Sequence, residues 1–309
     1  MSAFEGLPEL RTVDIDGPVA YREWGEHRSG RPTFVCVHGL GGSHVNWMGV
    51  APGLAGTGRV VALDLAGFGF TPREGRSSSM PANRLLLSRF IQRMAEPPVV
   101  LMGNSMGGAL SVLEVAYEPA SAAGLVLTSP ALPWARGGMP SALVLAAFAM
   151  YRMPGLGEWF VRARTNRLGP ERLIEEGFKI VMADAEKVDP ALVAAHVETA
   201  RVRAEDPDST SAFLEAARSL VRTGERKQFI AELVDRVRIP VLVIHGTKDR
   251  LVNVALARQV AGGRPNWRLV EFPDVGHVAQ MEEPNRWVAT VEQWLADAGL
   301  VQRDRAGAV

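Results

Sequence analysis

The segment that decides the fold is Val99–Leu110, which reads VVLMGNSMGGAL. Four apolar residues lead into a Gly-x-Ser-x-Gly motif, and residues with helical spacing follow from Met106 to Tyr117. A strand that turns at a serine directly into a helix holds the serine hydroxyl exposed on a sharp turn. Only small neighbours avoid a clash there, which explains Gly103 and Gly107. We therefore expect Ser105 to be a nucleophile at a helix N-terminus, where the helix dipole favours developing negative charge.

Short β-branched runs alternate with helix-like segments on both sides of this turn. Several of the runs are almost continuously apolar, as strands buried on both faces are. We expect strands at residues 19–23, 33–37, 59–64, 99–102, 125–128, 241–244 and 268–272, and helices at 83–94, 106–117 and 285–298. This alternation predicts the α/β class, with a mostly parallel sheet flanked by helices.

The alternation stops between about residues 134 and 224, where helix-like stretches are punctuated by prolines. We expect residues 1–133 and 225–309 to form one α/β core domain, and residues 134–224 to form an inserted helical cap. The insertion begins with Ser141–Tyr151, which is apolar on nearly every face and must pack against protein, lipid or substrate. Packing against the sheet and lining a substrate pocket are compatible, and we expect Phe148 to contact substrate.

The composition excludes several classes of protein. Lys+Arg and Asp+Glu are both 34, so no overall charge favours nucleic acid or an anionic membrane. A single cysteine excludes an internal disulfide, and the histidines outside the motifs lack paired metal-ligand spacing, so no metal is expected. The N-terminus does not resemble a secretory signal, and no apolar stretch is long enough to span a bilayer. We expect a cytoplasmic protein without stable membrane insertion.

A serine hydroxyl becomes an effective nucleophile only when a base takes its proton and a carboxylate orients that base. In a sheet of this kind the partners follow in the order serine, acid, histidine, each after a strand. Asp249 follows the expected strand 241–244, and His277 follows the strand that ends at residue 272. Asp249 is preferred over Asp64 and Asp274 because it alone lies after the first strand beyond the insertion. The sequence therefore predicts Ser105, Asp249 and His277 as the catalytic residues.

A glycine-rich loop follows the expected strand 33–37, and residues 35–43 read VCVHGLGGS. Acyl transfer places negative charge on the former carbonyl oxygen, and backbone N–H groups aimed at that oxygen stabilise it. We expect the N–H groups of Leu40 and Met106 to be these donors. His38 precedes the loop, and we expect it to hydrogen-bond the loop and fix its shape.

Over nearly its whole length the chain resembles the α/β-hydrolase superfamily with a helical cap. The resemblance rests on His38-Gly39, the motif at residues 103–107, Asp249 and His277. It also includes residues 64–71, DLAGFGFT, similar to the family's Asp-x-x-Gly-x-Gly-x-Ser loop except for its last two residues. The resemblance implies the fold and the three catalytic residues, and it says little about the substrate.

The elbow residue separates several chemistries within that superfamily. Dehalogenases and epoxide hydrolases carry aspartate at the elbow, so Ser105 disfavours both. Residues 103–108 also resemble hydrolases that cleave carbon–carbon bonds in ring-fission products. Those enzymes have His-Gly-x-Gly-Pro-Gly in the loop and tryptophan shortly after the histidine, whereas residues 41–43 read GGS and 278–281 read VAQM.

The leading hypothesis is a serine carboxylesterase that cleaves small to medium apolar esters through an acyl-enzyme and needs no cofactor. Its expected partner is a small-molecule ester. Carbon–carbon hydrolysis is the alternative, and a ligand-binding protein without turnover is the second alternative. Arginines at the start of the insertion, including Arg162 and Arg164, favour charge pairing within the cap, with a substrate carboxylate as the other option.

Overall fold

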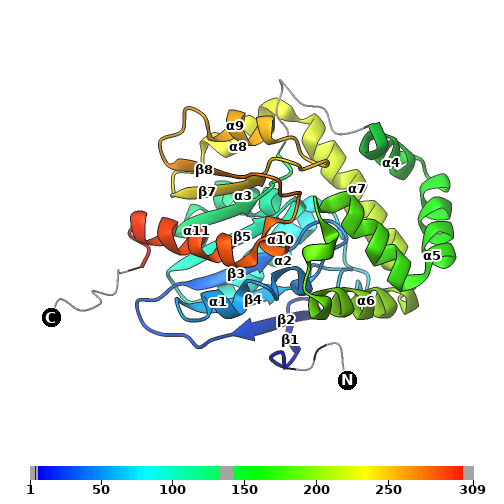
Figure 1. The fold of residues 1–309 in the computed structure, drawn as a ribbon, viewed down its shortest axis with the longest axis horizontal. Coiled ribbons are helices and arrows are strands. Elements are labelled where there is room, and N and C mark those ends of the chain that lie inside the picture. Colours follow the sequence, from blue (N-terminus) through cyan, green and yellow to red (C-terminus); the bar gives the residue numbers. More distant parts are fainter. Residues whose placement is uncertain (1–3, 5, 133–141, 302–309) are drawn as a thin grey trace.

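The computed structural model describes residues 4, 6–132 and 142–301, and its centre is a single eight-stranded sheet (Figure 1). The strand order is β1-β2-β4-β3-β5-β6-β7-β8. The pairs β1–β2 and β2–β4 are antiparallel, and every other pair is parallel. The strands are β1 (Arg11–Asp14), β2 (Pro18–Trp24), β3 (Thr33–Val37), β4 (Arg59–Leu63), β5 (Val99–Asn104), β6 (Gly124–Thr128), β7 (Val241–Gly246) and β8 (Trp267–Phe272).

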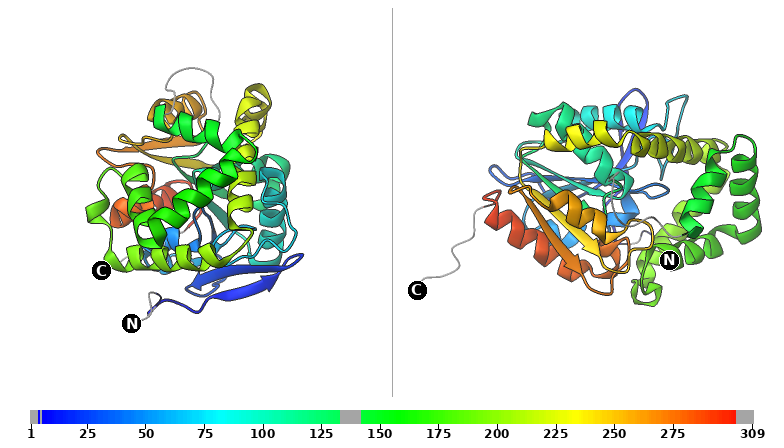
Figure 2. Two further views of the ribbon diagram at one scale, coloured as in Figure 1. Left: turned by 90° about the vertical axis from the view of Figure 1, so that its right-hand side faces the viewer. Right: turned by 90° about the horizontal axis from the view of Figure 1, so that it is seen from above.

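Helices cover both faces of the sheet (Figure 2). One face packs against α2 (Met80–Met94), α3 (Met106–Tyr117), α8 (Lys227–Asp235) and α9 (Val254–Ala261). The other packs against α1 (Ala51–Leu54), α10 (Ala279–Glu282) and α11 (Pro284–Asp297). Successive residues of a strand point to opposite faces, so Val35 and Val37 enter one apolar cluster while Phe34 and Cys36 enter the other. This two-sided burial explains the continuous apolar runs, and it confirms the predicted α/β class.

The strand predictions are confirmed, with one omission. The seven expected strands correspond to β2–β8 with small shifts at their ends, and the expected helix at residues 106–117 is α3. The missed strand, β1, is short and mostly exposed at the sheet edge. It lacks the apolar run by which buried strands are recognised.

Four helices between β6 and β7 lie to one side of the sheet, and we call them the cap helices (Figure 1). They are α4 (Ala142–Arg152), α5 (Leu156–Val181), α6 (Pro190–Glu205) and α7 (Ser209–Glu225). The proposed start of the insertion at residue 134, and Ser141, lie outside the described residues. The proposed end at residue 224 falls in the last turn of α7. Gly169, with φ 69°, interrupts α5 just before Pro170.

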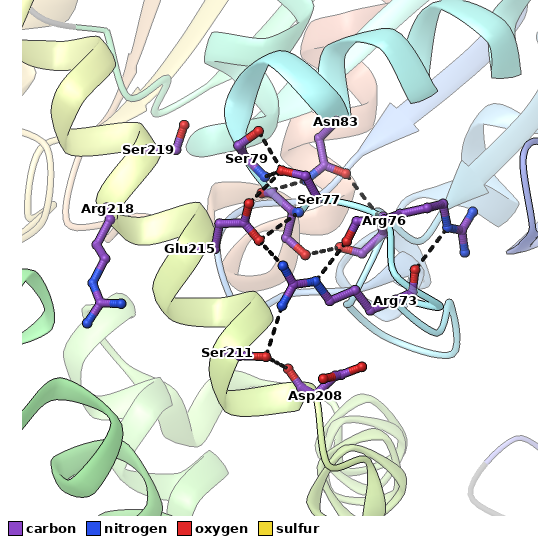
Figure 3. Close-up of polar contacts among 12 residues, drawn as sticks. Arg73, Arg76, Ser77, Ser79, Asn83, Asp208, Ser211, Glu215, Arg218 and Ser219 are labelled. Atoms are coloured by element: carbon purple, nitrogen blue, oxygen red, sulfur yellow. Dashed lines mark hydrogen bonds and ion pairs between the residues drawn. The ribbon is translucent and has the colours of Figure 1, made fainter. Parts of the chain in front are cut away.

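Polar contacts tie α7 to the loop that precedes α2 (Figure 3). The Glu215 carboxylate accepts hydrogen bonds from the Ser77 hydroxyl at 2.5 Å and the Ser78 N–H at 3.2 Å, and it forms an ion pair with Arg73. Arg73 also donates to the Ser211 hydroxyl at 3.0 Å. These five residues, which we call the α7 latch, fix one cap helix against the core.

Candidate active site

Ser105 lies at the turn between β5 and α3 with φ 54° and ψ −116°, a conformation that side chains with a Cβ atom rarely adopt. Its N–H donates to the Thr128 carbonyl at 3.0 Å, and its own carbonyl accepts from the N–H of Ala131 at 3.0 Å. A Cβ atom added at Gly103 would lie 2.5 Å from the Gly107 carbonyl oxygen, and one added at Gly107 would lie 2.2 Å from a β3 carbonyl oxygen. Both glycines are therefore required by close backbone contacts.

His277 and Asp249 are in direct contact. The Nδ1 atom of His277 donates to Oδ2 of Asp249 at 2.8 Å. The other carboxylate oxygen accepts from the N–H groups of Leu251 at 2.8 Å and Val252 at 3.0 Å. The structure thus brings together two of the predicted residues that are 28 positions apart.

The His277 loop is tied to the elbow and to the cap. The side-chain amide of Asn104, which precedes Ser105, donates to the His277 carbonyl at 3.1 Å. The His277 N–H donates to the carbonyl of Val181, the last residue of α5, at 2.7 Å. The position of His277 is therefore coupled to both the serine turn and a cap helix.

A second histidine contacts Asp249. Nε2 of His245, at the end of β7, lies 3.2 Å from Oδ2 of Asp249 and 2.8 Å from the Val252 carbonyl. Burial by itself would raise the pKa of Asp249, but the charges and hydrogen bonds of His277 and His245 outweigh it and hold that pKa below its usual range. His245 is not among the residues predicted from the sequence, where the signal for it is its place at a strand end four residues before Asp249.

The other two carboxylates considered from the sequence lie elsewhere. Asp64 is fully buried and accepts from His44 Nδ1 at 3.0 Å and from the Phe70 N–H at 2.8 Å. The Asp274 side chain is exposed, with Lys248 Nζ 3.6 Å away. Of the three, only Asp249 contacts His277.

The glycine-rich loop after β3 lies against the elbow. His38 is fully buried, with Nδ1 donating to the Gly39 carbonyl at 2.7 Å and Nε2 accepting from the Leu65 N–H at 3.0 Å. Burial lowers the pKa of His38, which favours this neutral form. A Cβ atom at Gly39 would lie 3.1 Å from that of Ser105. His38 thus hydrogen-bonds the loop, as expected from the sequence.

A cavity of about 1200 Å³ lies between the core and the cap helices. Ser105, His277 and Leu40 line its core side, and Met106 is the first residue of α3 beside them. Phe148, which is expected to contact substrate, lines the cap side of the cavity. Other apolar and aromatic cap residues on that wall are Val144, Tyr151, Phe160, Phe178 and Phe213, and basic ones are Arg162, Arg164 and Arg203.

Within residues 4, 6–132 and 142–301, no group of three or more His, Cys, Asp or Glu residues is arranged to hold a metal ion. No helix in this part of the chain combines the length and the apolar character that crossing a bilayer requires.

A model of the α/β hydrolase fold family matches residues 32–284, so the chain belongs to this family. Three relatives show how varied the activities of similar proteins are. A pimeloyl-[acyl-carrier protein] methyl ester esterase from Aromatoleum aromaticum is 27% identical over 85% of this chain and 97% of that protein. A 2-hydroxy-6-oxo-6-(2'-aminophenyl)hexa-2,4-dienoic acid hydrolase from Metapseudomonas resinovorans is 27% identical, covering 91% of this chain and 89% of that protein.

The third relative is the dihydrolipoyllysine-residue acetyltransferase component of the acetoin cleaving system of Cupriavidus necator, at 25% identity. The match covers 92% of this chain and 68% of that protein, and only 60% of the corresponding protein of Pseudomonas putida. Among solved structures, the haloalkane dehalogenase DatA from Agrobacterium tumefaciens has a TM-score of 0.79 at 20% identity over 96% of this chain and 99% of that chain. That likeness concerns the fold alone.

Proposed function

We propose that this hydrolase-family protein is a serine hydrolase that cleaves carboxylic esters of small to medium apolar substrates. The observation that carries the proposal is the 2.8 Å hydrogen bond between His277 and Asp249, formed beside a cavity that Ser105 also lines. The sharp turn at Ser105 supports the same assignment, because such a turn exposes the hydroxyl.

In this mechanism, the hydrogen bond from His277 Nδ1 to Asp249 leaves Nε2 to accept the Ser105 proton. The Ser105 oxygen attacks the ester carbonyl carbon, and the oxyanion accepts hydrogen bonds from the N–H groups of Leu40 and Met106. His277 then returns the proton to the leaving alcohol. A water molecule attacks the acyl-enzyme by the same route and releases the acid. No step uses a metal or a cofactor.

The cavity wall supports an apolar substrate. Aromatic side chains on the cap side, among them Phe148 and Phe213, offer surface for an acyl or alcohol chain. The volume of about 1200 Å³ lies slightly above the ~300–1,000 Å³ typical of small-molecule sites, so a medium-sized ester has room. The methyl ester esterase among the relatives is in keeping with this substrate class.

Carbon–carbon hydrolysis of a ring-fission product is the second candidate. It is favoured by the relative named as a dienoic acid hydrolase and by Arg203, a cation that lines the cavity and is paired with Asp206 at 2.6 Å. Binding without turnover is the remaining alternative.

A substrate screen with active-site labelling tests the proposal. p-Nitrophenyl acetate, butyrate, hexanoate and decanoate are assayed beside a ring-fission dienoate, before and after treatment with EDTA. A fluorophosphonate probe is expected to label Ser105, and the Ser105→Ala variant is expected to lose both labelling and turnover. Ser209→Ala, which alters another cavity serine, is the matched control and is expected to keep both. Turnover of the dienoate alone favours the second candidate, and turnover of neither substrate favours binding.

A further inference from the structure

The outer surface of the cap helices carries an unusual concentration of exposed apolar side chains. In the described part of the chain, seven large hydrophobic residues are exposed, and four of them lie between residues 145 and 159. The exposed fractions are 39% for Leu145, 51% for Met153, 38% for Leu156 and 64% for Trp159. We call these four residues the α4–α5 patch. Clustering of this kind marks an interaction surface rather than ordinary scattered exposure.

The patch faces away from the cavity. On α4, Val144, Phe148 and Tyr151 line the cavity, whereas the exposed Leu145 does not, and the exposed Met153 directly follows the last residue of this helix. On α5, Phe160 and Val161 line the cavity and the exposed Leu156 and Trp159 do not. Both helices therefore have an apolar face for the cavity and a second one for the surroundings. Figures 1 and 2 show that α4 and α5 form the outer edge of the cap, away from the sheet.

The segment that contains the patch is basic. Residues 142–172 contain five arginines, at positions 152, 162, 164, 167 and 172, against the two glutamates Glu158 and Glu171. Both glutamates are already paired, with Arg218 and Arg201, and of the five arginines Arg152 is paired with Glu225. Exposed apolar residues within a basic segment are complementary to a partner whose surface is anionic and whose interior, just below that surface, is apolar.

We propose that the α4–α5 patch docks onto an anionic lipid surface. Trp159 and Met153 enter the boundary between headgroups and acyl chains, where tryptophan is favoured because its ring is apolar and its N–H is polar. Arginines such as Arg167 lie at the headgroup level and attract the negative lipids. Exposed Arg162 also lines the cavity, so the cavity reaches the surface on the same helix. Docking therefore holds the cavity beside a phase in which apolar esters dissolve.

A second copy of the chain fits the patch less well. A two-fold symmetric contact places the same surface of two copies face to face, which brings the arginine clusters of both copies together. Like charges in such a contact repel each other, whereas anionic headgroups attract the same arginines.

Co-sedimentation with lipid vesicles tests the inference without depending on hydrolysis. The Ser105→Ala variant is measured alongside, so that vesicle binding is judged separately from ester hydrolysis. The full chain is expected to bind phosphatidylcholine vesicles that contain 30% phosphatidylglycerol, to bind pure phosphatidylcholine more weakly, and to lose binding at high salt. Trp159→Ser is expected to lower the partition coefficient about tenfold, because a large apolar side chain no longer leaves water. Leu85→Ser is the matched control: Leu85 is 49% exposed on α2, outside the patch.

Three results would overturn the inference. The first is the absence of sedimentation with phosphatidylglycerol vesicles, and the second is an equal loss of binding in the Trp159→Ser and Leu85→Ser variants. The third is a dimer in light scattering that Trp159→Ser converts to a monomer, since the patch is then an interface between copies. Thermal unfolding and p-nitrophenyl acetate turnover of Trp159→Ser are expected to match the unmodified chain, because Trp159 does not line the cavity.

Discussion

We expect the Ser105→Gly variant to be more stable than the Ser105→Ala variant, with a larger free energy of unfolding. Both variants lack the hydroxyl. Ser105 has φ 54° and ψ −116°, and a non-glycine residue held in such a sparsely populated conformation costs about 1–3 kcal/mol. Alanine keeps the Cβ atom and hence this cost, whereas glycine removes it. Glycine loses more backbone freedom on folding, which costs about 0.5–1 kcal/mol. The difference is therefore about 1 kcal/mol in favour of glycine.

Equilibrium urea unfolding of the two variants measures this difference, with both unfolding curves fitted to a common slope. Comparing glycine with alanine removes the contribution of the hydroxyl, so the result reports the backbone alone. The hydrogen bonds from Ser105 N–H to Thr128 and from Ala131 N–H to the Ser105 carbonyl hold the turn in either variant. If Ser105→Gly is no more stable than Ser105→Ala, the turn stores no strain and the reasoning is wrong.

Four further outcomes are expected. Asp249→Asn favours the wrong tautomer of the base, so p-nitrophenyl butyrate turnover is expected to fall by up to ~10⁴, while Asp274→Asn stays near normal; similar rates in both would refute the choice of acid. Phe148→Ala is expected to shift the preferred ester chain length in the screen without abolishing turnover, and an unchanged profile would remove Phe148 from the pocket. Burial lowers the pKa of His196 to about 4, so the folded protein loses stability as the pH falls from the unfolded value of about 6.5 towards 4. In the His196→Phe variant, the slope of the unfolding free energy against pH, measured by urea unfolding, is expected to fall by up to about 1.4 kcal/mol per pH unit between about pH 4 and 6.5. An unchanged slope would contradict this. Glu215→Ala removes the acceptor of the α7 latch and is expected to lower the unfolding free energy by about 1–3 kcal/mol in urea, whereas a change below a few tenths would show that the latch contributes little.

Hydrogen bonding around Asp249 shows how the parts of the site depend on one another. His245 and His277 both contact Oδ2, and two backbone N–H groups donate hydrogen bonds to the other carboxylate oxygen. Every one of these contacts favours the carboxylate form, in keeping with its lowered pKa. The carboxylate is therefore held in one orientation and one charge state around neutral pH.

The sequence by itself determined the strands, the serine turn and the order of the three predicted catalytic residues. These features follow from local patterns, because apolar runs specify buried strands and Gly103 and Gly107 specify a tight turn. The short edge strand β1 has no such pattern, since exposed strands need no apolar run.

Only the tertiary structure decided the contact of His245 with Asp249, the α7 latch and the shape of the cavity. The latch joins Arg73 and Ser77 to Glu215, which lies 138 or more positions later in the chain. The sequence also did not determine which face of α4 lines the cavity, because a stretch that is apolar on nearly every side does not indicate which side meets it. Such pairings depend on how the inserted helices pack against the sheet, and local sequence patterns record burial but not the identity of the neighbour.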